Sequence, residues 1–398
     1  MNITLILGRG QENCGVTRFA LEFKDYLDKH TKINSKIYAS IDKKWLGGRK
    51  QNGEIIKFSN DQIKSIATNI NNESDYVIYL SLPSKKSHTE EYKDLFYNEL
   101  VCNICKPKKL MLQLDHKRQS LSRNDRMIDI AKQMDALFTH SLDSNFTNVI
   151  QENNVVTNVN KFDLGMDFDS LKQEYYIPAA YQVRRMTFFS RYATFKDPLR
   201  MLDFYEELKN HNFITEMRGV ERSFGSMPLF YEDINNRENG IRSIIKWNRK
   251  NTAELQNEDY LYIYGTYERD HGLRMLSDSM FGADFYHLEN GYGNNFEFAM
   301  CEIIGVGCIP IFDIHWANNC THKNGKLFSD LKDFALYSDK NDIKGTVKEM
   351  KSLAGDNTKR NRLRNKSFEI AKAHCDIKVT MDDLLEKIKK VNKKSVLF

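Results

Sequence analysis

The sequence has few prolines and no long apolar run. It holds six prolines in 398 residues and no low-complexity tract, which argues against long disordered arms. It also lacks any run of about 18 apolar residues, so we expect no membrane span. The first apolar run is too short for a signal peptide and has no basic leader. We therefore expect the opening segment, MNITLILGRG, to form a first β-strand.

Metal-binding patterns are scarce as well. The seven cysteines are scattered, and Cys102 and Cys105 form a single CxxC without a second pair or a nearby histidine at ligand spacing. This pattern does not favour a zinc site, and free thiols in a reducing cytosol fit it best. We expect neither a metal nor a cofactor.

Strands and helices alternate along the whole chain, which predicts an α/β protein with mostly parallel sheets. A chain of 398 residues is long for one domain, so two are expected. We predict a Rossmann-like domain over residues 1–170, a second over 180–375 and a terminal helix over 376–398. The regular pattern breaks at 168–182, and a long polar region extends to about residue 256. A short strand is expected at 284–287 and another at 308–312.

The chain opens with a strand, a glycine-bearing loop and a helix at 17–30. Gly15 and Val16 precede this helix, where exposed backbone N–H groups favour an anion and glycine allows a ligand to approach closely. The strict dinucleotide fingerprint is absent, so the loop alone is a weak signal.

Two carboxylates stand out in the segment 296–312, FEFAMCEIIGVGCIPIF. Its first half is typical of a helix that carries Glu297 and Glu302 and ends at Gly305 and Gly307. Carboxylates at such a helix start can accept hydrogen bonds from the hydroxyls of a bound polyol. The alternative interpretation is a solvated glutamate pair.

Two cations lie in the loop SRYATFKD, which connects a predicted strand to a predicted helix. Arg191 and Lys196 are placed to neutralise a diphosphate at the carboxyl edge of a sheet, although ordinary surface charge is the alternative. Together with the glutamates they indicate a nucleotide-sugar site: Arg191 and Lys196 for the diphosphate, Glu302 for the ribose and Glu297 for the sugar. Because cations supply this charge, we expect no metal there.

Positive charge is concentrated in two runs that each follow a predicted strand. Residues 43–64 carry a local excess of four positive charges and residues 116–126 an excess of three, against +5 for the whole chain. A charge run is usually a solvated face. At the carboxyl edge of a sheet it also gives a positive field beside a ligand site.

Several segments in order along the chain resemble retaining GT-B glycosyltransferases and, more closely, the DNA α-glucosyltransferase family of T-even bacteriophages. They are RGQENCGVTRF at 9–19, LDHKRQSLSRN at 114–124, FTHS at 138–141, SRYATFKD at 190–197, GVERS at 219–223, and the E-x4-E and IPIF elements at 297–312. Two departures stand out. Leu114 occupies the place of a histidine in the family's His-Asp-His, and Asp197 stands where many relatives have glycine.

The resemblance implies a GT-B fold, with two Rossmann-like domains facing a cleft and a terminal helix that crosses back to the first. It implies transfer of a sugar from a UDP-sugar to 5-hydroxymethylcytosine in duplex DNA, with retention and base flipping, in the cytoplasm of an infected bacterium. The first domain would bind DNA and the second the UDP-sugar. The sugar is glucose or, given Leu114, a pentose such as arabinose. We expect a monomer that does not bind membranes.

The resemblance also extends the set of site residues. Asp115 and His116, at the end of a central strand, become the catalytic candidates, against the alternative that they cap a helix and support the structure. Arg222 becomes a diphosphate contact, or a partner of Glu221. The basic runs become phosphate contacts. These DNA-binding candidates are Lys43, Lys44, Arg49, Lys50, Lys117, Arg118 and Arg123.

Two other functions remain as hypotheses. A GT-B enzyme with a bacterial glycan or lipid acceptor would share the donor residues but would have no use for the basic runs. A non-enzymatic nucleic-acid-binding protein would use the basic runs and leave Arg191, Lys196, Glu297 and Glu302 idle.

Overall fold

The chain forms two units in a computed structural model. The first unit comprises Met1–Leu164 together with Thr380–Phe398, and the second comprises Gly165–Val379. The structure describes residues 1–10, 15–41, 59–80, 100–114, 125–140, 150, 155, 158–192, 196–219, 245–248, 255–265, 268–287, 296–319 and 334–392.

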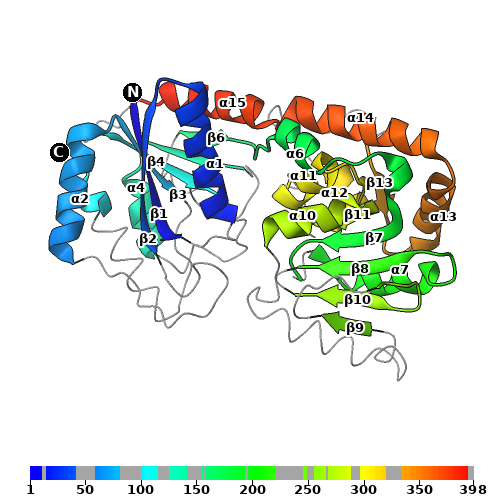
Figure 1. Cartoon of the computed structure of the whole chain (residues 1–398). Helices are drawn as coiled ribbons and strands as arrows, with labels where there is room; N and C mark the ends of the chain where they lie inside the picture. Colours follow the sequence, from blue (N-terminus) through cyan, green and yellow to red (C-terminus); the bar gives the residue numbers. More distant parts are fainter. Residues whose placement is uncertain are drawn as a thin grey trace. The chain divides into compact units, whose positions relative to one another are not determined.

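The first unit is built on a sheet of six parallel strands in the order β2-β1-β3-β4-β5-β6 (Figure 1). Its central strands are buried along their length, as parallel strands covered on both faces are. The strands are β1 (Asn2–Gly10), β2 (Asn34–Ile41), β3 (Tyr76–Leu80), β4 (Lys108–Gln113), β5 (Ala136–Thr139) and β6 (Val159–Lys161). The helices are α1 (Gly15–His30), α2 (Asn60–Glu73) and α4 (Asp125–Lys132).

Local sequence explains where the second helix starts. The Ser59 hydroxyl accepts a hydrogen bond from the Gln62 backbone N–H, and the Ser59 N–H donates to the Gln62 side chain. This reciprocal capping box satisfies two backbone donors that the first turn of α2 leaves without partners.

The carboxyl-terminal segment belongs to the first unit. Helix α15 (Ile377–Lys389) passes from the second unit into the first, where the Tyr26 hydroxyl donates to Asp382 at 2.6 Å. Beyond the helix, the Lys108 ammonium donates to the Val391 carbonyl at 2.7 Å. These contacts tie the end of the chain to α1 and β4.

The second unit holds a sheet of seven parallel strands in the order β13-β12-β11-β7-β8-β10-β9 (Figure 1). The strands are β7 (Val183–Phe189), β8 (Ile214–Arg218), β9 (Ile245–Asn248), β10 (Leu261–Tyr264), β11 (Ser279–Asp284), β12 (Ile309–Asp313) and β13 (Leu336–Ser338). The helices are α6 (Phe168–Tyr175), α7 (Arg200–Leu208), α10 (Arg269–Ser277), α11 (Phe298–Gly305), α12 (Ile314–Asn319), α13 (Ile343–Ala354) and α14 (Asn357–Cys375), with a 3-10 turn η3 (Ala179–Tyr181).

Each face of this sheet has its own hydrophobic core. Met186 and Phe188 of β7 pack into the core that α7 and α13 cover, whereas Phe189 packs into the core that α6, α10, α11 and α14 cover. Neighbouring residues of a strand point to opposite faces, so the sequence of β7 serves both cores at once. This two-sided cover confirms the predicted doubly wound α/β architecture.

Several element predictions need correction. The strand expected at 284–287 lies earlier: β11 ends at Asp284, and its Ser and Gly residues hid a strand that is buried throughout. The break at 168–182 contains α6, which Asp167 caps by accepting from the Ser170 N–H. The polar region before residue 256 contains β9.

The unit boundaries differ by several residues from the predicted domain limits. The prediction placed them at 170–180 and 376, whereas the chain divides after Leu164 and after Val379. The separate roles assigned to the two domains stay a prediction.

A buried carboxylate joins β7, β8 and the segment before β10. Glu216 is fully buried and accepts hydrogen bonds from Thr187 at 2.8 Å, Arg218 at 3.0 Å and Gln256 at 2.8 Å. Burial by itself raises the pKa of Glu216, but the charges of Arg218 and Arg185 outweigh it, so the net pKa lies below the ordinary value of 4.5. Glu216 is therefore ionised in the fold.

We expect Glu216→Gln to lower the free energy of unfolding by about 3 kcal/mol at neutral pH, because buried guanidinium groups lose their counter-charge. The lowered pKa stabilises the fold fully above pH 4.5, and this contribution is lost as the pH falls through the folded-state pKa. The difference in free energy of unfolding between wild type and Glu216→Gln should therefore become smaller at acidic pH. Urea unfolding across this pH range measures it, with exposed Glu349→Gln as control. A variant as stable as wild type at neutral pH contradicts the prediction.

Candidate functional site

The carboxyl ends of the parallel strands meet at one edge of the second sheet, where ligands of open α/β sheets bind. β11 lies between β7 and β12, so the residues that end these three strands are neighbours. They are Ser190 directly after β7, Asp284 at the end of β11 and Asp313 at the end of β12. This edge therefore brings together polar groups that are far apart in the sequence.

Lys196 is held at this edge by Asp284. Its Nζ donates to Asp284 Oδ2 at 2.9 Å, and the exposed fractions of the two side chains are only 5% and 0%. The ammonium also lies 4.3 Å from the centroid of the Tyr286 ring. The ammonium of Lys196 is thus fixed in position without any ligand.

Asp284 is itself held from three directions. Ser190 Oγ donates to its Oδ2 at 3.2 Å, and the Tyr286 N–H donates to its Oδ1 at 2.9 Å. Burial raises the pKa of Asp284 above its ordinary value, the neighbouring Lys196 opposes the rise, and the charge of Glu297 adds to it. Glu297 is the N-cap of α11, so the charge that adds to the rise comes from the start of that helix.

Arg191 lies on the same connection as Lys196, between β7 and α7. It follows Ser190 directly at the end of β7, and its side chain is exposed. The two cations predicted to bind a diphosphate therefore share one strand-to-helix connection, one open to solvent and one buried.

The two predicted glutamates lie on α11 as a cap and an interior residue. Glu297 is the N-cap of the helix in an extended conformation, and Gly305 ends it. Glu302 is buried and accepts from Arg269 Nε at 2.8 Å. Arg269 was not among the predicted site residues; the sequence marks it only as the first residue of the helix after β10. The hydroxyl-binding roles of both glutamates stay a prediction.

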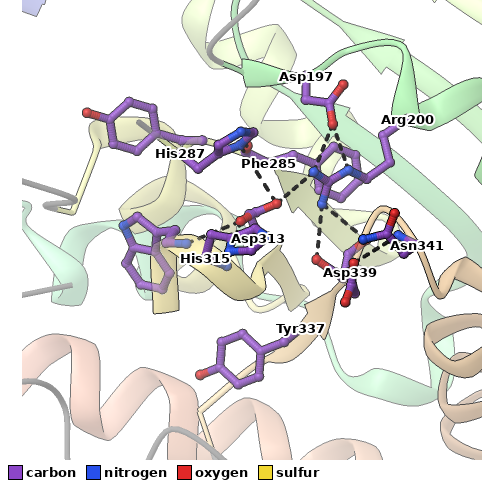
Figure 2. A network of polar contacts seen from close by, with 12 residues as sticks. Asp197, Arg200, Phe285, His287, Asp313, His315, Tyr337, Asp339 and Asn341 are labelled. Carbon is purple, nitrogen blue, oxygen red and sulfur yellow. Dashed lines mark hydrogen bonds and ion pairs between the residues drawn. The ribbon is translucent and has the colours of Figure 1, made fainter. Parts of the chain in front are cut away.

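A second charged network, also missed, lies beside the Lys196 pair. Figure 2 shows Arg200, the first residue of α7, between Asp197 and Asp313, above the ring of Phe285. Arg200 Nη2 lies 2.8 Å from Asp197 Oδ2 and 2.6 Å from Asp313 Oδ2, and Nη1 donates to the Ser338 carbonyl at 3.0 Å. One buried guanidinium thus joins the start of α7 to the ends of β12 and β13.

In the first unit, a buried histidine supports the end of β4. His140 Nε2 lies 3.0 Å from the Leu114 carbonyl oxygen, so this nitrogen carries the proton and donates. Leu114 directly precedes the predicted catalytic pair Asp115 and His116.

Many predicted site residues lie outside the described residues. They are Asp115, His116, Arg222, Lys43, Lys44, Arg49, Lys50, Lys117, Arg118 and Arg123. Gly15 and Val16 are described and form the first turn of α1. Their contact with a donor stays a prediction, as do the roles of the residues above.

Two searches of the described part of the chain found nothing. No group of three or more His, Cys, Asp or Glu side chains there is arranged to hold a metal ion. Among the helices of those residues, none is both long and apolar enough to cross a bilayer.

Two α/β units in one chain, each built on a parallel sheet, are the architecture of the GT-B class of fold. Residues 14–358 match the model of the DNA alpha-glucosyltransferase family, and the chain belongs to this family. The resemblance inferred from the sequence motifs is thereby confirmed.

Individual relatives agree with this assignment. The chain is 27% identical over 403 residues to the DNA alpha-glucosyltransferase of Enterobacteria phage T4, with 94% of this chain and 96% of the relative covered. A solved alpha-glucosyltransferase in complex with UDP and a 13-mer DNA containing an HMU base gives a TM-score of 0.83 at 23% identity, over 98% of this chain and all of that one. Another, in complex with UDP-glucose and DNA containing an abasic site, gives 0.84 at 23%, over 98% and 100%.

A more distant fold relative is the α,α-trehalose 6-phosphate synthase of Burkholderia multivorans. Its TM-score is 0.60 at 11% identity, over 98% of this chain and 96% of that one. The structural matches share the fold with this chain.

We expect the Lys196–Asp284 pair to be replaceable without loss of stability, because burial costs the two charges about as much as their attraction returns. Asp284→Asn alone leaves a buried ammonium beside a neutral amide and should lower the free energy of unfolding by about 3 kcal/mol. Adding Lys196→Met should bring stability back to within about 1 kcal/mol of wild type. Urea unfolding measures all three proteins, with exposed Asp259→Asn as control. A double variant no more stable than Asp284→Asn would show that the two residues are not coupled.

Proposed function

We propose that the protein transfers a sugar from a UDP-sugar to the hydroxymethyl group of 5-hydroxymethylcytosine in duplex DNA, with retention at the anomeric carbon. The family match over residues 14–358 is the observation that carries this proposal. Support comes from the phage T4 relative and from solved relatives that hold UDP or UDP-glucose together with DNA. Since that relative is a phage enzyme, the proposed place of action is the cytoplasm of an infected bacterium.

The second unit is proposed to bind the donor. Lys196, preset by Asp284, and exposed Arg191 neutralise the diphosphate, with Arg222 as a further contact. Fixed cations at the leaving diphosphate stabilise the charge that develops as the glycosidic bond breaks. Since these cations can supply that charge, the proposal needs no metal.

Glutamates are proposed to orient the rest of the donor. Glu297, as the N-cap of α11, accepts from sugar hydroxyls, and Glu302 accepts from the ribose with the carboxylate that Arg269 already orients. Gly15 and Val16 at the start of α1 contribute backbone N–H groups to the donor.

The first unit is proposed to supply the acceptor side. A base inside a duplex cannot meet the anomeric carbon, so the modified cytosine is flipped out of the stack. Asp115 takes the hydroxyl proton or stabilises an oxocarbenium-like transition state, and His116 orients it or holds the sugar. His140 is proposed to support Asp115 indirectly, because it binds the backbone carbonyl of the preceding residue, Leu114.

The transferred sugar is proposed to be glucose or arabinose. The chain has Leu114 where the family has a polar histidine, and the described Leu114 is 9% exposed. An apolar side chain at that place favours a donor that lacks a polar group there, such as a pentose without the hydroxymethyl carbon.

We expect purified protein to add a hexose or a pentose to 5-hydroxymethylcytosine when it is incubated with UDP-glucose or UDP-arabinose and modified duplex DNA. Mass spectrometry of the nucleosides identifies the sugar, and NMR of the product identifies the anomer. Lys196→Met should lower kcat/KM by roughly 10²-fold, as the loss of one preorganised charge does. DNA with unmodified cytosine is the control. If neither donor yields a product while UDP-sugar is still hydrolysed, a different acceptor class replaces this proposal.

We expect DNA affinity to fall steeply with salt, because the basic runs at 43–64 and 116–126 are proposed to contact phosphates. The slope of log K against log salt should be about −0.9 for each contacted phosphate. Replacing Lys43 and Lys44 by alanine should therefore reduce the slope by about 2. Fluorescence anisotropy with labelled duplex measures it, and exposed Lys348→Ala on α13 serves as the control. A wild-type affinity independent of salt would remove these runs from the interface.

A further inference from the structure

The residue that follows Lys196 has an unusual backbone conformation. Asp197 has a φ of +42°, in the left-handed region that residues other than glycine seldom adopt. Pro198 comes next and restricts the chain further. The bend lies between Lys196 and the start of α7, so it links the residue that pairs with Asp284 to the first residues of that helix.

The side chain of Asp197 holds the bend in place. Its Oδ2 accepts from Arg200 Nε at 2.9 Å and lies 2.8 Å from Nη2, and its carbonyl accepts from the Arg200 N–H at 3.2 Å. The exposed fraction of the Asp197 side chain is 26%, so this pair is shielded from solvent on most sides. A charged, two-point contact of this kind fixes both the carboxylate and the backbone around it.

Arg200 is in turn fixed to the sheet. Its side chain is 1% exposed, pairs with Asp313 at the end of β12 and donates to the Ser338 carbonyl at the end of β13. The guanidinium lies 4.8 Å from the centroid of the Phe285 ring, directly after β11. Figure 2 shows Asp313 and Phe285 beside the Arg200 guanidinium. Three strand ends therefore define where Asp197 can be.

The end of β11 also binds Lys196. Its partner Asp284 ends β11, one residue before Phe285, and its ring contact Tyr286 follows Phe285. A change at Asp197 would alter the path of the chain between two fixed points, Asp284 for the ammonium and Arg200 for the bend. Two contacts therefore fix these adjacent residues: Lys196 is bound to Asp284, and Asp197 to Arg200.

We propose that Asp197, Arg200 and Asp313 form an elbow latch that holds Lys196 where the diphosphate of the donor binds, with Asp197 and Arg200 as positioning residues. This inference rests on the proposed function, because it takes the ligand of Lys196 to be a diphosphate. The latch supplies, through an ion pair, a backbone conformation that a glycine would adopt without help.

A matched pair of variants tests the latch. Asp197→Ala and Asp197→Gly both remove the carboxylate, but only glycine reaches a φ of +42° without steric cost. We expect the Kd for UDP, measured by calorimetry on the full chain, to rise about tenfold in Asp197→Ala and less than about threefold in Asp197→Gly. The KM for the UDP-sugar should rise in parallel in the alanine variant, with kcat changed less. Asp197→Ser replaces alanine should that variant fail to fold.

Uridine separates a local effect on the diphosphate from general damage. It lacks phosphates, so its affinity should be the same in wild type and in both variants. Equal UDP affinities of the alanine and glycine variants overturn the latch, whether both are weak or both match wild type, and so does a parallel loss of uridine binding. Wild-type protein that binds no UDP overturns the proposed function itself, and the role of the latch with it.

Discussion

The ammonium of Lys196 and the carboxylate of Asp284 form a buried ion pair on which the candidate site depends. Removing two charges from water is costly, and their attraction in the protein interior only about balances that cost. The pair therefore adds little to stability, and its value lies in position. In a medium of low polarity, a cation with a fixed location acts more strongly on a nearby anion than a mobile one in water does.

The α/β architecture could be predicted from the sequence because strands and helices have local sequence patterns. Apolar runs of strand length alternating with amphipathic segments predict a parallel sheet, and a parallel sheet places strand ends at one edge. That logic located Arg191, Lys196, Glu297 and Glu302. It could not supply the partners Asp284 and Arg269, which are 88 residues from Lys196 and 33 from Glu302. Asp284 was even assigned to the start of a strand that it in fact ends. Such pairings follow from strand order, which the local pattern leaves open.

The two departures from the family pattern, Asp197 and Leu114, differ in which part of the residue makes the structural contact. At Asp197, where the resemblance to the family implies glycine in many relatives, the backbone is left-handed, and an ion pair with Arg200 accompanies it. The substitution thus preserves a conformation by other means. At Leu114, the side chain is nearly buried and the backbone carbonyl meets His140. Here the contact with His140 is made by the backbone carbonyl, so it does not depend on which side chain occupies the position.

The number of carboxylates beside a site proposed for an anion needs a physical reason. Each of these carboxylates already pairs with a cation before a ligand binds. Asp284 pairs with Lys196, whereas Asp197 and Asp313 both pair with Arg200. An ammonium has three N–H donors, and one of them serves Asp284. A phosphate oxygen can therefore share Lys196 with Asp284 without displacing it. The carboxylates keep Lys196 and Arg200 in place when the site is empty, but they exceed these two cations by one charge, which the exposed Arg191 balances. The proposed binding of a diphosphate therefore rests on direct donation from Lys196 and Arg191 and not on a net positive charge of this cluster.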